Sequence, residues 1–494
     1  MLTQRRGILI LAGIFVLMNL IGLDRSGVVW IDEVTLNDPA KELALHGVFR
    51  SSVFSGFDGF DQTYLWLPPA HPLITAFIYK LFGFGIWQTR IPVVLFGACA
   101  VVALYFVALH FLNDHRSAFF SALLFAFNPQ FIHTARSGRM DTQCLFFAFI
   151  GILLFLRSSY YHRNNSIFLS VAGLSIGLAG MTHPIAIVWA MAIAALILFV
   201  QKERKVSRLI IFCASAAVPT IAWLFFSLRT PVYFKAQFLS IVADHSAQGS
   251  IVSRIIEECM RYGRIHYSVP LLLISFIAGS LWFVFKRKED AERKRTLIVL
   301  FAIPFLFIMF FMIKDGGSWF SILHPISMLT IMVGAMAGSF LPTNIKRPET
   351  VWQKRSLLAA SLLLANLFVA GIGGRYIILA YQWNARDYRT IEEPIRTLIP
   401  EGSVIFGAPE VWYAAVKAGA SLRVRGEPNP DIHDFVVTKL KDSIVALPGF
   451  HKIAEIGEPF PPVLTRYTLS LADYQMAVWE ADRRIGDVIQ LTGL

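Results

Sequence analysis

Residues 28–34 read VVWIDEV and place two carboxylates, Asp32 and Glu33, side by side just after the first long apolar run of the chain. That run, residues 7–23, contains no charged side chain and approaches the length that a helix needs to cross a hydrocarbon core, about 20 residues. The pair is therefore either the ordinary polar end of a membrane helix or the start of a functional segment. Features in the rest of the sequence distinguish these two interpretations.

The composition of the chain is that of an integral membrane protein. Of its 494 residues, 55% are hydrophobic and only 16% are charged, and the mean hydropathy is +0.58, whereas soluble domains contain about 25% charged residues. The net charge of +12 comes from short basic clusters between apolar runs, as in the cytoplasmic loops of membrane proteins. We therefore expect the lipid bilayer as a partner, and no nucleic acid.

The apolar runs predict an α-helical polytopic membrane protein with about eleven transmembrane helices. Basic clusters such as residues 201–208 (QKERKVSR) and 286–295 (KRKEDAERKR) all fall on one side, which the positive-inside rule makes the cytoplasmic side. The predicted spans lie near residues 7–23, 89–112, 117–132, 142–157, 166–182, 184–200, 208–228, 268–285, 296–313, 319–341 and 356–380.

This topology puts most of the unusual polar residues on the outer face. The outer face receives residues 24–88, 128–141, 229–267 and 314–318, and the tail from Tyr381 onward. Residues 1–380 are predicted to form a transmembrane catalytic domain with the first external loop at 24–88. Residues 381–494 are less apolar and are predicted to form a small extramembrane α/β domain in the periplasm. Its expected strands are 403–407, 434–438, 443–447 and 474–480, with a helix at 410–419.

Three motifs on this outer face occur in a fixed order along the chain. They are WIDEVTLNDPAKELALHG at 30–47, PPAHPL at 68–73 and ARSGRMD at 135–141. Within the first motif, the spacing of alanine and leucine at 39–47 predicts an amphipathic helix that lies on the membrane surface. A long, patterned external loop directly after the first span usually carries function.

With these motifs, residues 1–200 resemble the GT-C superfamily of membrane glycosyltransferases. The resemblance is to the branch that contains the dolichyl-phosphate-mannose protein mannosyltransferases and the bacterial lipid A aminoarabinose transferases. That branch has an acidic pair at the start of the first external loop, an HPPL sequence before the second span and an R-x-x-x-x-D turn between the third and fourth spans. This chain departs from the branch in two places. PPAHPL lacks the second proline of HPPL at its usual position, and Thr182-His183-Pro184 stands where many members have a Lys-Gly-Pro type turn. These departures leave the donor sugar and the phosphate contacts open.

The resemblance implies a GT-C-like fold and an inverting transfer of one hexosyl or pentosyl unit from a polyprenyl-phosphate donor to a lipid, glycan or protein acceptor. Such a transfer needs a carboxylate that accepts the proton of the attacking hydroxyl. We expect Asp32 to be this base and Glu33 to be its support, although the two roles could be reversed. We expect Asp141 to orient the acceptor or the base.

Cations at the outer face are candidates for binding the phosphate of the donor, because guanidinium groups bind phosphate in bidentate fashion and a leaving phosphate needs no strong acid. The candidates are Arg136, Arg139, His183, Arg261, Arg264 and Lys314. A divalent metal ion is the one cofactor that the sequence leaves open, with Glu33, His71 and His183 as its candidate ligands.

Two other functions stay open from the sequence alone. A transporter or flippase for lipid-linked saccharides would have charges in the middle of its spans and an internal repeat, whereas the charges here are concentrated on one face. A non-catalytic envelope assembly protein would use the tail as its recognition domain. For the glycosyltransferase, the expected setting is a bacterial inner membrane, with the active site on the periplasmic face.

Overall fold

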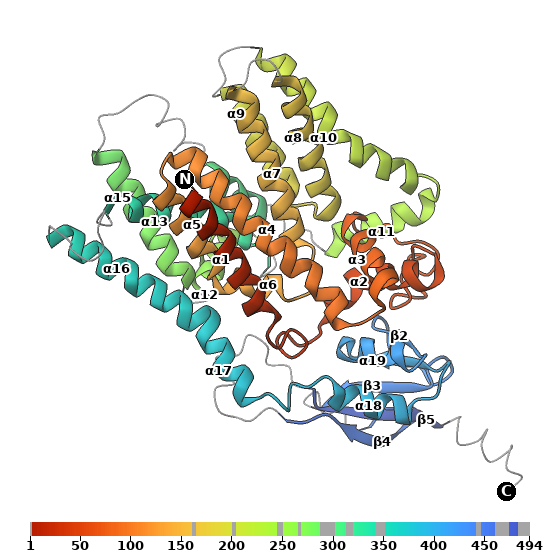
Figure 1. Ribbon diagram of the computed structural model, residues 1–494. Coiled ribbons are helices and arrows are strands. Elements are labelled where there is room, and N and C mark those ends of the chain that lie inside the picture. The colour runs from red at the N-terminus through yellow and green to blue at the C-terminus, as the bar shows by residue number, and fades with distance from the viewer. Residues whose placement is uncertain are drawn as a thin grey trace, which may run out of the picture.

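The computed structural model describes residues 2–160, 165–199, 204–244, 250–264, 268–286, 302–312, 320–340, 351–440, 446–459 and 474–482. These residues form a bundle of helices and one five-stranded sheet near the C-terminus (Figure 1). The elements of the bundle are α1 (Leu2–Leu20), α2 (Ile31–His46), α3 (Ala70–Phe82), α4 (Ile86–Leu112), α5 (His115–Ala126), α6 (Pro129–Ala135), α7 (Asp141–Tyr160), α8 (Asn165–Thr182), α9 (Ala186–Phe199), α10 (Lys205–Ser227), α11 (Pro231–Asp244), α12 (Ile251–Arg264), α13 (Ser268–Lys286), α15 (Leu323–Phe340), α16 (Val351–Leu367), the π-helix η2 (Phe368–Gly373) and α17 (Gly374–Tyr381).

Three helices of the described residues are long and apolar enough to cross a membrane. They are α4, residues 141–158 of α7, and α10. Shorter apolar helices of 10 to 17 residues coincide with most of the other predicted spans, but they fall short of the length that a crossing requires. The predicted count of about eleven spans is therefore not confirmed.

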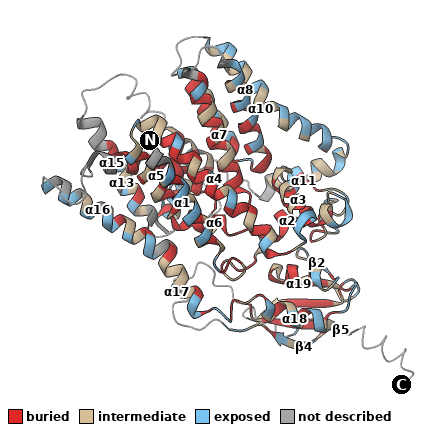
Figure 2. Cartoon of the chain, viewed as in Figure 1, coloured by how far each residue is buried: buried red, intermediate tan, exposed pale blue. Residues whose placement is uncertain are grey.

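Helix α10 has an apolar surface that the rest of the chain leaves uncovered. Only 6% of its most apolar window is buried, against 67% for α4 and for α7, and Figure 2 shows this difference. Val206, Ile210 and Phe225 on α10 are each more than 60% exposed. Such a surface is unfavourable in water and suits contact with lipid.

The uncovered helix is held in place by close backbone packing against α8. Gly173 and Gly177 lie one helical turn apart on α8, and a Cβ atom on either residue would come within 2.5 Å of a carbonyl oxygen of α10. Small residues at this spacing let two helices approach closely, which is a common way to pack helices in a membrane.

Helix α2 differs from the expected amphipathic surface helix at 39–47. It begins already at Ile31, and every side chain from Glu33 to Glu42 is buried. The prediction of a membrane-surface helix was wrong, because the rest of the first loop folds over α2. Asp38, for example, accepts hydrogen bonds from the backbone N–H groups of Ser52 (2.6 Å) and Val53 (3.1 Å).

The C-terminal part is a small α/β layer. Its sheet has the order β2-β1-β3-β5-β4, in which β1 is parallel to β2 and β3, and β5 is antiparallel to β3 and β4. The elements are α18 (Arg389–Leu398), β1 (Val404–Gly407), η3 (Pro409–Val411), α19 (Trp412–Lys417), β2 (Ser421–Arg423), β3 (Phe435–Lys439), β4 (Phe450–Ile456) and β5 (Met476–Ala481).

Strands β1, β3 and β5 and helix α19 confirm the expected elements, whereas β2, β4 and α18 were not predicted. The strand expected at 443–447 falls mostly outside the described residues.

The first external loop and the C-terminal part share one hydrophobic core. Val28, Val29 and Val34 pack in the same cluster as Tyr388 and Trp412, and Figure 1 shows the sheet, α18 and α19 beyond the ends of α2, α3 and α4. Because this core joins both sides of the predicted boundary at residue 380, the division into two domains stays a prediction.

Candidate active site

Asp32 and Glu33 are neighbours in the first turn of α2, but they lie in opposite environments. The Asp32 side chain is 35% exposed, whereas the Glu33 side chain is fully buried. Consecutive side chains on an α-helix point about 100° apart, so one can face outward while the other faces the core. Only Asp32 is therefore open to a molecule that arrives from solvent.

Arg139 joins Asp32 to Asp141. Its Nη1 donates to Asp32 Oδ2, and its Nε donates to Asp141 Oδ2 over 2.9 Å. The guanidinium also lies 4.0 Å from the ring centroid of Phe320 and 5.8 Å from that of Trp30. The two carboxylates and the aromatic faces together fix the position of this cation.

Two histidines lie on the far side of Asp141. His183 Nε2 is 3.9 Å from Asp141 Oδ1, and the ring centroids of His183 and His324 are 6.4 Å apart. His183 Nδ1 accepts a hydrogen bond from the backbone N–H of Ile185, and His324 Nδ1 accepts one from Trp189 Nε1. When neutral, each ring therefore carries its proton on Nε2.

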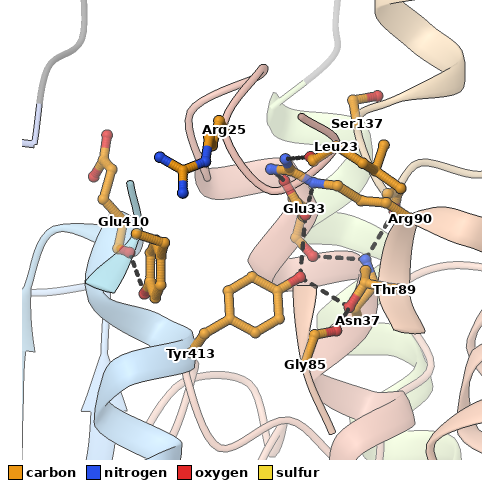
Figure 3. Close-up of polar contacts among 12 residues, drawn as sticks. Leu23, Arg25, Glu33, Asn37, Gly85, Thr89, Arg90, Ser137, Glu410 and Tyr413 are labelled. Carbon is orange, nitrogen blue, oxygen red and sulfur yellow. Dashed lines mark hydrogen bonds and ion pairs between the residues drawn. The ribbon is translucent and has the colours of Figure 1, made fainter. Parts of the chain in front are cut away.

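Glu33 is held by a buried network at the opposite side of α2 (Figure 3). Arg90 of α4 binds its carboxylate in bidentate fashion, with distances of 2.8 Å to Oε1 and 2.7 Å to Oε2. Arg90 Nη1 donates to the carbonyl of Leu23 over 2.7 Å. The hydroxyl of Tyr413, from α19, donates to Glu33 Oε1 over 3.1 Å.

His71 belongs to this supporting network through Asn37. Asn37 Nδ2 donates to the carbonyls of Glu33 (2.7 Å) and Gly138 (2.8 Å), which leaves its Oδ1 to face His71 Nε2 at 3.1 Å. Burial lowers the pKa of His71 to about 4, so the ring is neutral at pH 7. Its Nδ1 lies 2.9 Å from Gln143 Oε1, so both ring nitrogens face amide oxygens, and the neutral ring can donate to only one of them.

The expected metal ligands Glu33, His71 and His183 do not form a shared site. Glu33 is committed to Arg90 and Tyr413, both nitrogens of His71 are committed to amides, and His183 Nδ1 accepts from a backbone N–H. Within the described ranges, no group of three or more His, Cys, Asp or Glu side chains could hold a metal ion. The chemistry and arrangement of these residues do not fit a metal ion.

Arg136 was expected to bind phosphate, but the structure gives it another role. It is 1% exposed, and its guanidinium donates to the carbonyls of Asn19 (2.5 Å), Ile21 (2.9 Å) and Gly22 (2.7 Å) at the end of α1. The last carbonyls of a helix lack partners within the helix, and a cation stabilises that end. Arg136 therefore caps α1.

Of the remaining phosphate candidates, two belong to α12 and one falls outside the described residues. Arg261 on α12 pairs with Glu258, and its guanidinium lies 4.6 Å from the ring centroid of Phe311. Arg264 ends α12, and Lys314 falls outside the described residues. Among the described cations expected to bind phosphate, Arg139 and His183 lie next to Asp32 or Asp141.

Several residues of the site were missed from the sequence. Arg90 carried a usable signal, because it is a charge inside the predicted span 89–112, and such charges are functional candidates by default. Asn37, Phe320 and Tyr413 carried none. Their importance comes from long-range packing, which local patterns do not report.

Comparisons with known proteins show which proteins this chain resembles. Residues 67–230 match the model of the family described as dolichyl-phosphate-mannose-protein mannosyltransferase. The chain is 27% identical over 275 residues to dolichyl-phosphooligosaccharide-protein glycotransferase 1 of Archaeoglobus fulgidus, a match that covers 50% of this chain and 43% of that relative. The chain thus spans less than half the length of this curated relative.

Solved structures resemble nearly the whole chain. ArnT from Cupriavidus metallidurans, bound to undecaprenyl phosphate, superposes with a TM-score of 0.63 at 14% identity, and the match covers 96% of this chain and 97% of ArnT. The oligosaccharyltransferase AglB from Archaeoglobus fulgidus, in complex with an inhibitory peptide and a dolichol-phosphate, superposes with a TM-score of 0.58 at 11% identity, covering 89% of this chain and 69% of AglB. The chain has the GT-C fold. The resemblance expected from the three motifs is thereby confirmed.

Proposed function

We propose that this GT-C protein is an inverting glycosyltransferase with Asp32 as its general base. The observation that carries the proposal is the contrast within the acidic pair, in which Asp32 is 35% exposed and Glu33 is fully buried. A general base must come within hydrogen-bond distance of the proton that it removes. The exposed side chain of Asp32 can be reached by an acceptor hydroxyl, whereas Glu33 is enclosed by Arg90 and Tyr413.

The proposed reaction transfers one hexosyl or pentosyl unit from a polyprenyl phosphate. The acceptor hydroxyl attacks the anomeric carbon, its proton passes to Asp32, and the bond from the anomeric carbon to the phosphate oxygen breaks. The polyprenyl phosphate leaves with its negative charge. The lipid phosphates named in the ArnT and AglB structures support this donor class, and the peptide named with AglB supports a protein among the acceptors, beside a lipid or a glycan.

Arg139 is proposed to assist both the removal of the proton by Asp32 and the departure of the phosphate. Its contacts with Asp32 and Asp141 would orient the base, and its charge is proposed to stabilise the leaving phosphate. Asp141 in turn holds Arg139 and lies beside His183. Arg261, Arg264 and Lys314 stay proposed contacts for the phosphate.

The proposed setting is a bacterial inner membrane with the active site on the periplasmic face. The distribution of basic clusters supports this orientation by the positive-inside rule. The uncovered apolar surface of α10 supports contact with lipid, which a donor with a polyprenyl tail requires.

Mass spectrometry of envelope lipids, glycans and proteins tests the proposal in cells with and without the chain. We expect one class of molecule to lose a single sugar residue when the chain is absent and to regain it when the gene is restored. That class identifies the acceptor. Identical envelope profiles in the two strains, under conditions in which the chain is expressed, would contradict a role in sugar transfer.

A further inference from the structure

The C-terminal α/β part reaches the acidic pair directly through one side chain. Tyr413 of α19 lies 380 positions from Glu33 in the chain, yet its hydroxyl is 3.1 Å from Glu33 Oε1 and 2.9 Å from Thr89 Oγ1 (Figure 3). Tyr413 is itself fully buried. The carboxylate next to the proposed base therefore has a hydrogen-bond donor from the far end of the chain.

The hydroxyl of Tyr413 acts as a donor in this contact. The hydroxyl of Thr89 already donates its proton to the carbonyl of Gly85 over 2.9 Å. Its oxygen therefore acts as the acceptor in the contact with Tyr413. Burial and the charge of Glu33 raise the pKa of Tyr413 far above its usual value, which keeps the phenol protonated. Tyr413 thus directs its proton between Thr89 and Glu33.

The ring of Tyr413 is held from several sides. Its centroid lies 5.3 Å from that of Phe84, which precedes α4, and 6.0 Å from that of Tyr388 in an edge-on arrangement. Phe84 also meets Trp412 edge-on at 5.1 Å. Aromatic contacts of this kind add to the energy of burial and restrict the ring to one position.

The orientation of the first turn of α2 depends on Glu33. The residue that precedes the helix, Trp30, makes no side-chain cap, so no capping hydrogen bond fixes this turn. The turn is fixed instead by the bonds of Glu33 to Arg90 and Tyr413, and by Asn37, which ties the carbonyl of Glu33 to that of Gly138. Asp32 shares this turn, so its direction depends on how Glu33 is held as well as on its contact with Arg139.

We propose that Tyr413 is a positioning residue, which sets the direction of Asp32 by holding Glu33, and that the C-terminal α/β part is thereby a component of the catalytic unit. This inference rests on the proposed role of Asp32 as base. It assigns the C-terminal part a role in positioning the proposed base, in addition to any role in binding the acceptor.

The test uses the full-length protein and the variant Tyr413→Phe, which removes the hydroxyl and keeps the ring. Tyr388→Phe is the matched control. It removes another buried tyrosine hydroxyl, which donates to the carbonyl of Glu410 in η3 and accepts from the backbone N–H of Ala414 in α19. Neither of these bonds involves Glu33. Hydrogen–deuterium exchange of the purified proteins is measured at residues 28–36 and at β3.

Turnover is measured by mass spectrometry after the purified protein is added to membranes from cells that lack the chain. These membranes supply their own donor and acceptor. The amount of membrane is varied, so that the maximal rate of turnover and the amount of membrane that gives half of this rate are obtained separately. We expect Tyr413→Phe to speed exchange at residues 28–36 and to leave β3 protected. We expect turnover to fall about tenfold with little change in half-saturation, because small misplacements of a catalytic group are costly. Tyr388→Phe should leave exchange at residues 28–36 unchanged.

The inference is overturned by any of three results: wild-type exchange and turnover in Tyr413→Phe, equal losses in Tyr388→Phe, or loss of protection at β3, which would make the role one of domain stability. If wild-type protein transfers no sugar to these membranes, the proposed function has failed. The exchange data then still report whether Tyr413 holds the first turn of α2.

Discussion

At the scale of single residues, Asp32 and Glu33 are neighbours on α2 but have different environments and different proposed roles. Asp32 faces solvent and Arg139, while Glu33 faces Arg90 and the interior. The sequence predicted the pair and its importance, but it could not divide the roles, because the division depends on Arg90 and Tyr413, which approach from other parts of the chain. The same holds for Arg136, whose contacts with the end of α1 have no local signature.

His71 gives a prediction about pH at the same scale. Burial lowers its pKa from 6.5 in the unfolded chain to about 4 in the folded protein. The unfolded state therefore takes up a proton between these two pH values before the folded state does, so the stabilisation is complete above pH 6.5 and is lost as the pH falls toward 4. We expect the melting temperature in detergent to fall over this range, and to fall less in His71→Gln.

The control for this measurement is His46→Gln, at the exposed C-terminal end of α2. It should retain the full acid sensitivity of the wild-type protein. If His71→Gln and the wild-type protein lose the same amount of stability between pH 6.5 and pH 4.5, then His71 is not the neutral buried ring that links Asn37 to Gln143.

At the scale of elements, the ion pair of Glu33 and Arg90 joins α2 to α4. Both side chains are fully buried, and removing one partner of a buried pair typically costs about 3–5 kcal/mol because the other charge stays buried alone. We expect Arg90→Met to lower the free energy of unfolding by this amount, measured by denaturant titration in detergent. The same variant should lower sugar transfer, since α2 carries the base.

Lys417→Gln provides the comparison for Arg90→Met. Lys417 pairs with Glu392 at the surface of the C-terminal part, where its side chain is 39% exposed. Exposed pairs contribute at most about 1 kcal/mol. Equal destabilisation by the two variants would mean that the Arg90 pair does not act as a buried link between α2 and α4.

The elements also show where sequence patterns suffice. Short apolar runs predicted β1, β3 and β5, because each of these strands carries its own hydrophobic segment. Sequence patterns failed for β2, because this strand has only three residues. They also failed for α2, because its burial comes from contacts with residues 51–53 and with the C-terminal part. A helix that is enclosed on all sides by later segments cannot be recognised as such from its own spacing.

At the scale of the whole molecule, the fold brings three distant segments to one place. The first loop supplies Asp32, the turn before α7 supplies Arg139 and Asp141, and the C-terminal part supplies Tyr413. Motif order and topology predicted that the first two segments share a face of the membrane. They did not predict the third, because the shared core of Val28, Val29 and Trp412 arises only on folding.

The most direct test of the central claim compares two alleles in cells that otherwise lack the chain. Asp32→Asn removes the proposed base, and Asp61→Asn makes the same change at another position of the first loop, where the carboxylate contacts Gln62. With equal amounts of each protein in the membrane, mass spectrometry should show the added sugar restored by Asp61→Asn and by the wild-type gene, and missing with Asp32→Asn. Full restoration by Asp32→Asn would contradict the account.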